Sequence, residues 1–221
     1  MKRAIVSIIL LCFVGIVYAG SGIVPAGAVP GMFPVGGATF PNTSVLSDFT
    51  GTNGTVPTGF TDLVGTPQIQ SNQFAGGSAD DNTAIWDTSY TADNLEAYVT
   101  VATVPGDTGV VALFFGDGSL NGYGLICQKL TAGTDTCEVH LLVAGSTGAQ
   151  VGSTQDQEFS NGDQIGFKRS GSTLQIWYKP AAGSATQLGG DITDATYNPD
   201  QIAISVTGTA ARLDDFGGGT P

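Results

Sequence analysis

The chain has 221 residues, of which 41% are hydrophobic, 12% are charged and 33 are glycine, and its formal net charge is −12. An acidic surface repels nucleic acid and anionic lipid headgroups, and the sequence contains no basic patch that would offset this repulsion. Low charge content, abundant glycine and the lack of a 3.6-residue apolar period after residue 20 argue against helices. The composition therefore favours one all-β domain and excludes a nucleic-acid-binding protein.

The first nineteen residues have the pattern of a secretory signal peptide. Lys2 and Arg3 form a positive start, residues 4–17 form a short apolar run, and a small residue, Ala19, precedes Gly20. Because the apolar run is shorter than the ~18–20 residues of a membrane-spanning helix, we predict cleavage after Ala19. Cleavage would leave five basic and nineteen acidic residues, hence a formal charge of −14, in a secreted chain without a membrane span.

The following segment, 20–44, is an apolar arm or linker rich in glycine and proline. Residues 20–41 carry no charge, and four prolines among them exclude a regular helix or strand. One interpretation is a flexible leader ahead of the domain. The other is an arm that packs on a neighbouring subunit or surface, because a solvated linker is normally polar.

Many short segments after residue 44 show the features of half-buried antiparallel strands, bounded by Gly, Ser, Pro or Asp. In chain order the candidate strands are 45–49, 68–74, 83–87, 96–104, 109–115, 123–129, 136–143, 163–169, 173–179, 201–207 and 211–216. Residues 145–160 are rich in turn formers and are assigned to a connection. Strands this short and numerous predict an all-β, two-sheet antiparallel β-sandwich.

Two cysteines remain after signal removal, and they lie on consecutive candidate strands. If these strands form a hairpin with Cys127 opposite Cys137, the same register places Leu125 opposite Val139. Because one register aligns both the cysteines and an apolar stripe, we predict a disulfide between Cys127 and Cys137. The alternative is a pair of free buried thiols.

Several short motifs, in their order and spacing, resemble the concanavalin A-like lectin/glucanase superfamily, and in particular its laminin-G-like β-sandwich domains. The motifs are LSDF at 46–49, the alternating strand that begins with Gly162-Asp163, STLQIW at 172–177 and LDDF at 213–216. The resemblance covers about 45–219. It implies a jelly-roll sandwich whose first and last strands pair in one sheet, with carbohydrate as the ligand class.

The residues that catalysis on this fold requires do not occur at the required spacing. Glucanases of the superfamily carry an E-x-D-x-x-E strand that directs paired carboxylates into one cleft, whereas Glu96, Glu138 and Glu158 lie in no such motif. His140 is the only histidine and has neither a G-x-S-x-G serine nor metal-ligand companions. We therefore predict a non-catalytic binding protein. A pair of aspartates that meet in space is the remaining enzymatic alternative.

A structural calcium ion is predicted where the first strand meets the last. In several carbohydrate-binding sandwiches an aspartate of an LDD motif binds calcium beside the N-terminal strand, so the resemblance implies Asp214 and Asp215 as ligands, with Asp48 as their companion. Carboxylate oxygens suit Ca²⁺. The alternative is that one of these aspartates only accepts hydrogen bonds from the adjacent turn.

A carbohydrate platform is predicted on one strand face. Trp177 and Gln175 share a face of their strand, and Lys168 lies nearby on the preceding strand. If the other face is in the core, the Trp177 indole stands outward and could stack on a sugar ring. The alternative is that a loop or segment 20–41 covers Trp177. Trp86 is open to the same two interpretations.

These observations predict a secreted, non-catalytic binding module with its domain at 45–221. Its expected partner is a glycan or cell-surface polysaccharide. The competing hypothesis is a structural subunit of an extracellular surface layer, filament or virion-like appendage, which would assemble through the apolar segment 20–41. In that case the partner is another copy of the chain.

Overall fold

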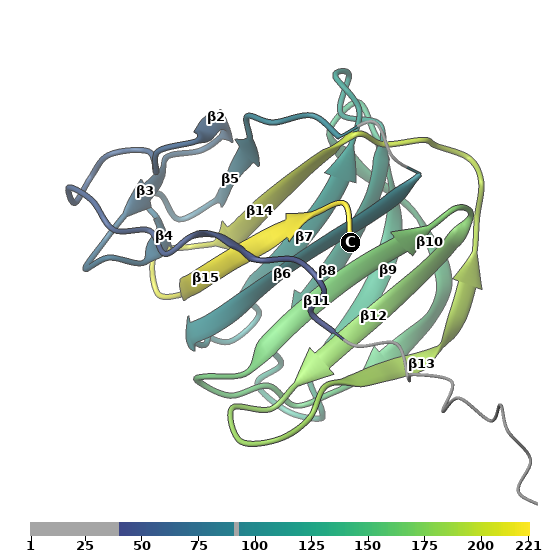
Figure 1. Cartoon of the computed structure of the whole chain (residues 1–221). Coiled ribbons are helices and arrows are strands. Elements are labelled where there is room, and N and C mark those ends of the chain that lie inside the picture. The colour runs from purple at the N-terminus through teal and green to yellow at the C-terminus, as the bar shows by residue number, and fades with distance from the viewer. Residues whose placement is uncertain (1–39, 91–92) are drawn as a thin grey trace, which may run out of the picture. The chain divides into compact units, whose positions relative to one another are not determined.

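The computed structural model describes residues 40–90 and 93–221, which form strands and no helices in this part of the chain (Figure 1). The predicted signal peptide, 1–19, and residues 20–39 of the predicted arm lie outside the described residues. Among the residues that are described, no helix is long and apolar enough to cross a membrane.

The structure contains fifteen strands in the described ranges. Their bounds are β1 Val45–Ser47, β2 Phe60–Val64, β3 Pro67–Ile69, β4 Phe74–Gly76, β5 Asp81–Trp86, β6 Asn94–Thr103, β7 Val110–Gly116, β8 Gly122–Gln128, β9 Thr136–Val143, β10 Ser146–Asp156, β11 Gln164–Ser170, β12 Thr173–Lys179, β13 Thr186–Thr193, β14 Gln201–Thr207 and β15 Arg212–Gly219.

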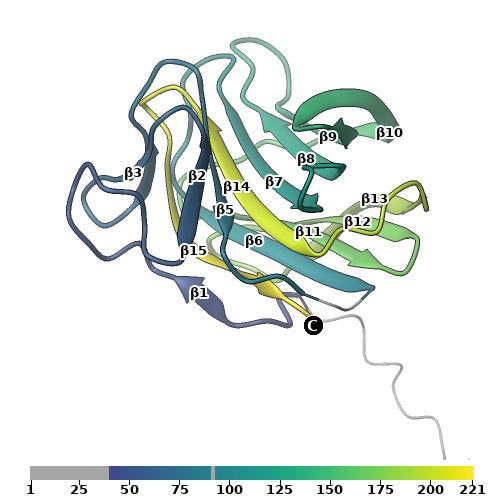
Figure 2. The ribbon, with the colours of Figure 1, turned by 90° about the horizontal axis from the view of Figure 1, so that it is seen from above.

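The strands form two antiparallel sheets that lie as opposing layers (Figure 2). Sheet A has the order β13-β12-β11-β6-β15-β4-β3, with β1 also paired to β15, and sheet B has the order β10-β9-β8-β7-β14-β5-β2. Strands distant in sequence are neighbours in both sheets, as in a jelly roll. The predicted two-sheet antiparallel sandwich is confirmed, and so is the expected pairing of the first strand with the last.

Buried and outward-facing side chains alternate along the central strands, and the buried ones form the core between the sheets. In β7, for example, Leu113 and Phe115 are fully buried in the core, while Phe114 between them faces away from it. Phe115 of sheet B stacks on Phe167 of sheet A, with ring centroids 4.5 Å apart. Full burial of a phenylalanine contributes about 1.5–3 kcal/mol, so such contacts across the interior hold the two layers together.

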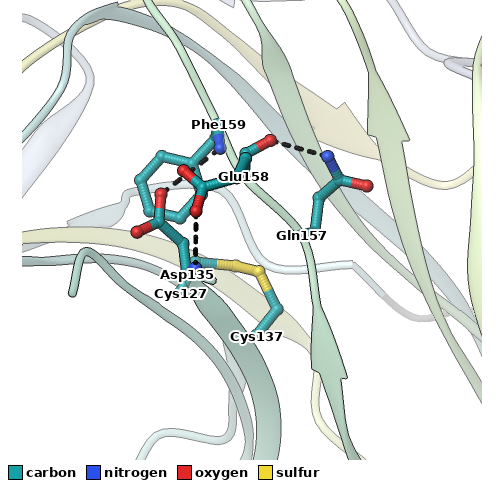
Figure 3. Close-up of a disulfide and its surroundings, with 6 residues drawn as sticks. All are labelled: Cys127, Asp135, Cys137, Gln157, Glu158 and Phe159. Carbon is teal, nitrogen blue, oxygen red and sulfur yellow. Dashed lines mark hydrogen bonds between the residues drawn. A yellow bond between two sulfur atoms is a disulfide. The ribbon is translucent and has the colours of Figure 1, made fainter. Parts of the chain in front are cut away.

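The cysteine hairpin has the register that the sequence predicted. Cys127 pairs with Cys137 and Leu125 pairs with Val139 on β8 and β9, and the two sulfur atoms are joined in a disulfide. Figure 3 shows this bond beside the segment that follows β10.

A buried carboxylate, Asp135, closes the turn next to the disulfide (Figure 3). Its Oδ1 accepts a hydrogen bond from Leu130 N–H at 3.0 Å, and its Oδ2 accepts one from Lys129 Nζ at 2.9 Å. Its own N–H donates to Glu158 Oε1 at 3.3 Å. Burial acts to raise the pKa of Asp135, but the hydrogen bonds from Leu130 and Lys129 outweigh it, and the pKa lies below its ordinary value.

The predicted strand 68–74 is wrong, because a tight turn divides it into β3 and β4. Gln70 and Gln73 exchange backbone hydrogen bonds at 2.8 and 3.2 Å, and between them Ser71 and Asn72 have φ values of 55° and 58°. Two successive residues at positive φ are the geometry of a two-residue hairpin turn. Ser71-Asn72 is thus a turn, but the alternation of apolar and polar residues around it led to the prediction of one continuous strand.

The prediction of a connection at 145–160 is also wrong, since β10 is an eleven-residue strand. Strands β2 and β13 were not predicted at all. All three lie at sheet edges, and most of their side chains are exposed or half-buried. Because they have little buried face, their sequences lack the apolar alternation by which the central strands are recognised.

Candidate functional site

The predicted platform residues come together on the outer face of sheet A. Lys168 pairs with Gln175 across β11 and β12. Gln175 Oε1 accepts a hydrogen bond from Trp177 Nε1 at 3.3 Å, and Gln175 Nε2 donates to Asp191 Oδ1 at 2.8 Å.

Trp177 is nevertheless no open platform, because Phe40 covers it. The two rings stack with centroids 5.3 Å apart and planes 10° apart, and the Tyr98 ring meets Phe40 edge-on at 6.0 Å. Only 6% of Trp177 is exposed. A Cβ at Gly166 would overlap the Phe40 ring, so this glycine forms the floor of the socket. Of the two interpretations of Trp177, the structure shows the covered one, and the residue that covers the indole, Phe40, belongs to the predicted arm.

Glu96 holds the same segment to sheet A. Its Oε1 accepts hydrogen bonds from Asn42 N–H at 2.8 Å, Thr43 N–H at 2.9 Å and Thr43 Oγ1 at 2.7 Å. Lys168 Nζ lies 4.0 Å from Oε2 of this fully buried carboxylate. Tyr98 donates its hydroxyl proton to Thr43 O at 3.0 Å. Burial, together with nearby carboxylates, raises the pKa of Tyr98 to about 12, so the phenol remains a donor at neutral pH.

The predicted calcium ligands lie where β1 meets β15. Burial, and then the charges of Asp215 and Asp48, raise the pKa of Asp214. Asp48 Oδ1 accepts Thr50 N–H at 3.0 Å and Asp214 Oδ1 accepts Asp215 N–H at 2.9 Å. Within the described part of the chain, no group of three acidic, histidine or cysteine side chains is arranged to hold a metal.

A pocket of about 460 Å³ opens beside Asp48. We call it the corner pocket, and its walls are β1, residues 49–50 and 57–59, and Trp86 at the end of β5. Trp86 is half-buried and its ring meets Phe60 edge-on at 5.1 Å. A Cβ at Gly59 would lie 2.6 Å from the indole, so the close approach requires glycine there.

The corner pocket combines an aromatic surface with oxygen groups. Ser47, Asp48, Thr50 and Thr58 line it together with Trp86. The hydrogen bond from Thr50 N–H lowers the pKa of the exposed Asp48 carboxyl, so this group is ionised at neutral pH. Asp48 was predicted as a calcium ligand and Trp86 was considered as a sugar platform, but no sequence pattern indicated that they meet. Their proximity depends on how β1 of sheet A lies against β5 of sheet B.

A second hollow, of about 320 Å³, lies on the outer face of sheet B. We call it the sheet B groove. Its lining comes from alternate residues of successive strands that point away from the core. The apolar part includes Ile85, Ala112, Phe114, Ile126, Leu142 and Ala203. No sequence pattern indicated this groove, because the strands that line it become neighbours only in the folded sheet.

The residues weighed as catalytic groups have structural partners. Glu96 holds the segment at residues 42–43, and Glu158 contacts Lys129 and Asp135. His140 Nε2 lies 2.9 Å from Glu138 Oε2, and its Nδ1 lies 3.2 Å from Gly148 O. The contacts of His140 lie within β9 and with the neighbouring strand β10.

Known structures share this fold, although no family model and no curated protein matches the sequence. The carbohydrate-binding module CBM66 from Bacillus subtilis is 18% identical and aligns with a TM-score of 0.56 over 72% of this chain and 94% of that one. The exoplasmic/lumenal domain of VIP36, in a Ca²⁺/Man-bound form, is 10% identical, with a TM-score of 0.58 over 80% and 88%.

A legume lectin-like domain from Entamoeba histolytica is also similar, with 10% identity and a TM-score of 0.52 over 72% of this chain and 87% of that one. At such identities the likeness concerns the fold. It agrees with the strand order and with the motifs that resemble this superfamily. The chain therefore has the concanavalin A-like β-sandwich fold of lectins and carbohydrate-binding modules.

Proposed function

We propose that the protein is a non-catalytic carbohydrate-binding module and that the corner pocket is its binding site. The observation that carries this proposal is the Trp86 ring beside an ionised carboxylate and several hydroxyls in a pocket of about 460 Å³. Sugars present C–H faces that pack on aromatic rings and hydroxyls that need directed polar partners. The neighbouring folds, which include a carbohydrate-binding module and a Man-bound domain, support the same ligand class.

Within the pocket the residues take different roles. The exposed part of the Trp86 indole is the stacking surface, and its packing on Phe60 keeps the ring in place. Asp48 accepts hydrogen bonds from sugar hydroxyls, because its lowered pKa keeps it ionised. Trp177, Gln175 and Lys168 are not included, since Phe40 covers Trp177; they would become a binding surface only if Phe40 left its socket.

Calcium belongs to the same proposal. Burial is the main cause of the raised pKa of Asp214, and the negative charges of Asp215 and Asp48 add to it. A cation would relieve the repulsion among these charges, and carboxylate oxygens suit Ca²⁺. Because the described residues include no group of three such side chains arranged to hold a metal, binding requires these carboxylates to reorient. A calcium ion here would orient Asp48 at the wall of the corner pocket.

We also propose that the protein is secreted. The signal-like residues 1–19 support export, and a disulfide persists in oxidising compartments.

A glycan array with the protein of residues 20–221, followed by calorimetry on the best ligand, tests the binding proposal. Asp48→Asn keeps an oxygen for Thr50 N–H but removes the charge, and we expect at least a tenfold loss of affinity. Trp86→Phe shortens the stacking surface while retaining an aromatic ring against Phe60, and should also weaken binding. Asp107→Asn, in an exposed loop outside the pocket, is the matched control. Binding that is unchanged in both pocket variants would overturn the proposed site, and an array without a ligand would overturn the function.

A further inference from the structure

The sheet B groove is an apolar channel that crosses its strands. Its lining extends from Val64 on the edge strand β2, over β5, β14, β7, β8 and β9, to Thr147 on the opposite edge strand β10. Phe114 on β7 lies between these ends and provides the aromatic surface. Among the described residues that line the groove, Asp81 alone is charged. Val64 is 48% exposed, so this apolar surface meets solvent in the isolated domain.

The dimensions of the groove suit a short extended peptide. Strands β2 and β10 are six positions apart in sheet B. With about 4.8 Å between neighbouring strands, the groove is about 29 Å long. A polyproline II segment rises about 3.1 Å per residue, so about nine residues fill this length.

The chain itself contains a segment of matching chemistry. Residues 20–39 carry no charge and combine Pro25, Pro30 and Pro34 with Val24 and Phe33. Proline-rich extended segments bind aromatic-lined grooves because their backbone is already ordered. The groove lies on the face of the sheet and not along an edge, so the occupant does not need to donate ladder hydrogen bonds, which proline cannot do.

The position at which residues 20–39 join the domain favours binding to the groove of another copy over binding to the groove of the same chain. Phe40 is held on the outer face of sheet A by Trp177, Tyr98 and the Gly166 floor, and Glu96 fixes the next residues. The groove lies on the outer face of sheet B, on the other side of the sandwich. Within one chain, residues 20–39 would have to pass around an edge of the sandwich to reach it. A segment that comes from another copy does not have to pass around an edge of the sandwich that binds it.

We propose that the sheet B groove binds the uncharged segment 20–39 of a second copy of this chain. The donating and accepting surfaces lie on opposite faces, so the contact is heterologous. Heterologous contacts generate rings or open chains of subunits. The protein thus assembles head to tail, through a surface separate from the corner pocket.

Complementation between two variants tests this arrangement. One protein comprises residues 40–221 and keeps the groove but lacks the segment. The other comprises residues 20–221 with Ile126→Glu, which puts a charge at a half-exposed position in the groove. By light scattering, each should be monomeric alone, while an equimolar mixture should form 1:1 dimers and nothing larger. Unaltered 20–221 should form larger, concentration-dependent assemblies.

Val143→Glu is the matched control, because Val143 is 50% exposed and outside the groove lining, and this variant should assemble normally. Thermal unfolding of the Ile126→Glu protein verifies that it is folded, and Leu63→Glu serves as a second groove variant. A monomeric 20–221 protein, or a mixture that does not associate, would overturn the proposal. If that monomer also protects its own residues 20–39 from protease, the segment binds within one chain and not between copies.

A synthetic peptide of residues 20–39 identifies the occupant directly. It should bind the 40–221 protein, and Ile126→Glu should weaken binding at least tenfold. If instead the glycan ligand binds in the groove, its binding will be lost in Ile126→Glu and retained in Asp48→Asn. That result would overturn both the assignment of the groove to segment 20–39 and the assignment of the corner pocket to the glycan. If only the groove proposal fails, the protein does not assemble but glycan binding in the corner pocket is unchanged.

Discussion

Two buried carboxylates of this protein, Glu96 and Asp135, accept hydrogen bonds from backbone N–H groups of the segments that pack against them. Glu96 Oε1 accepts two backbone N–H groups and a hydroxyl, with Lys168 Nζ near its other oxygen. Asp135 accepts one backbone N–H and the Lys129 ammonium at 3.0 Å or less. Hydrogen bonds to a charged group offset part of the cost of removing it from water. Each of these side chains therefore fixes the position of a neighbouring segment.

The hydrogen bonds of Asp135 predict a pH dependence of stability. Its pKa is lower in the folded protein than in the unfolded chain, where it is about 3.9. The folded state therefore binds fewer protons, and the contribution to stability is fully present above about pH 4 and is lost as pH falls through the folded pKa. At pH 7, Asp135→Asn should lower the free energy of unfolding by about 1.5–3 kcal/mol.

Urea unfolding of the wild type and of Asp135→Asn between pH 2 and pH 7 measures this effect. The difference between the two proteins should shrink as the solution becomes more acidic. Asp107→Asn, an exposed control, should follow the wild type throughout. A difference that stays constant over this range would contradict the role assigned to the ionised carboxylate.

The elements of the sandwich differ in how they are held. Central strands such as β7 and β14 have a buried face and two hydrogen-bonded neighbours, whereas β10 is paired only with β9 at the edge of sheet B. The segment at residues 40–43 belongs to no strand. It is held on sheet A by the aromatic socket and by Glu96.

A methyl group at the floor of the socket should expel this segment. In Gly166→Ala the new Cβ overlaps the Phe40 ring, and such overpacking costs about 1–3 kcal/mol. Phe40 should leave Trp177, whose fluorescence should then become more accessible to acrylamide. In the control Gly118→Ala the added Cβ has open space around it, and quenching should stay as in the wild type. Equal quenching in both variants would show that Phe40 does not depend on the glycine floor.

At the scale of the whole molecule, the two ends of the described chain meet in one sheet. Val45 pairs with Gly217, and the carboxylates proposed to bind calcium lie at this junction. A ligand that binds only the folded state stabilises it, by about 2.7 kcal/mol at a hundredfold excess over its Kd. A calcium ion at Asp48, Asp214 and Asp215 would therefore tie the first strand to the last.

Calorimetry of the protein with calcium and with excess chelator checks this prediction. Chelation should lower the Tm by several degrees, and Asp214→Ala should remove the sensitivity to calcium. The exposed Asp107→Asn control should retain it. A Tm that chelator leaves unchanged would contradict a structural calcium site and would leave the local hydrogen bonds as the role of these aspartates.

Local alternation was sufficient to predict the central strands, the hairpin register and the disulfide. Burial of one strand face imposes a period of two on the sequence, and Cys127, Leu125 and their partners share one such face. The edge strands β2, β10 and β13 were missed for the same reason, since little burial imposes little pattern. The motifs from 46–49 to 213–216 were sufficient to indicate the superfamily fold.

The sites depended on contacts between segments that are distant in the chain. The sequence placed Trp177 on an outward face, but only the folded chain shows that Phe40 stacks on it. Asp48 and Trp86 share a pocket because β1 and β5 lie at the same corner of the sandwich. Strand faces are determined by local side-chain polarity, whereas what covers a face is determined by long-range packing, which leaves no periodic signal in the sequence.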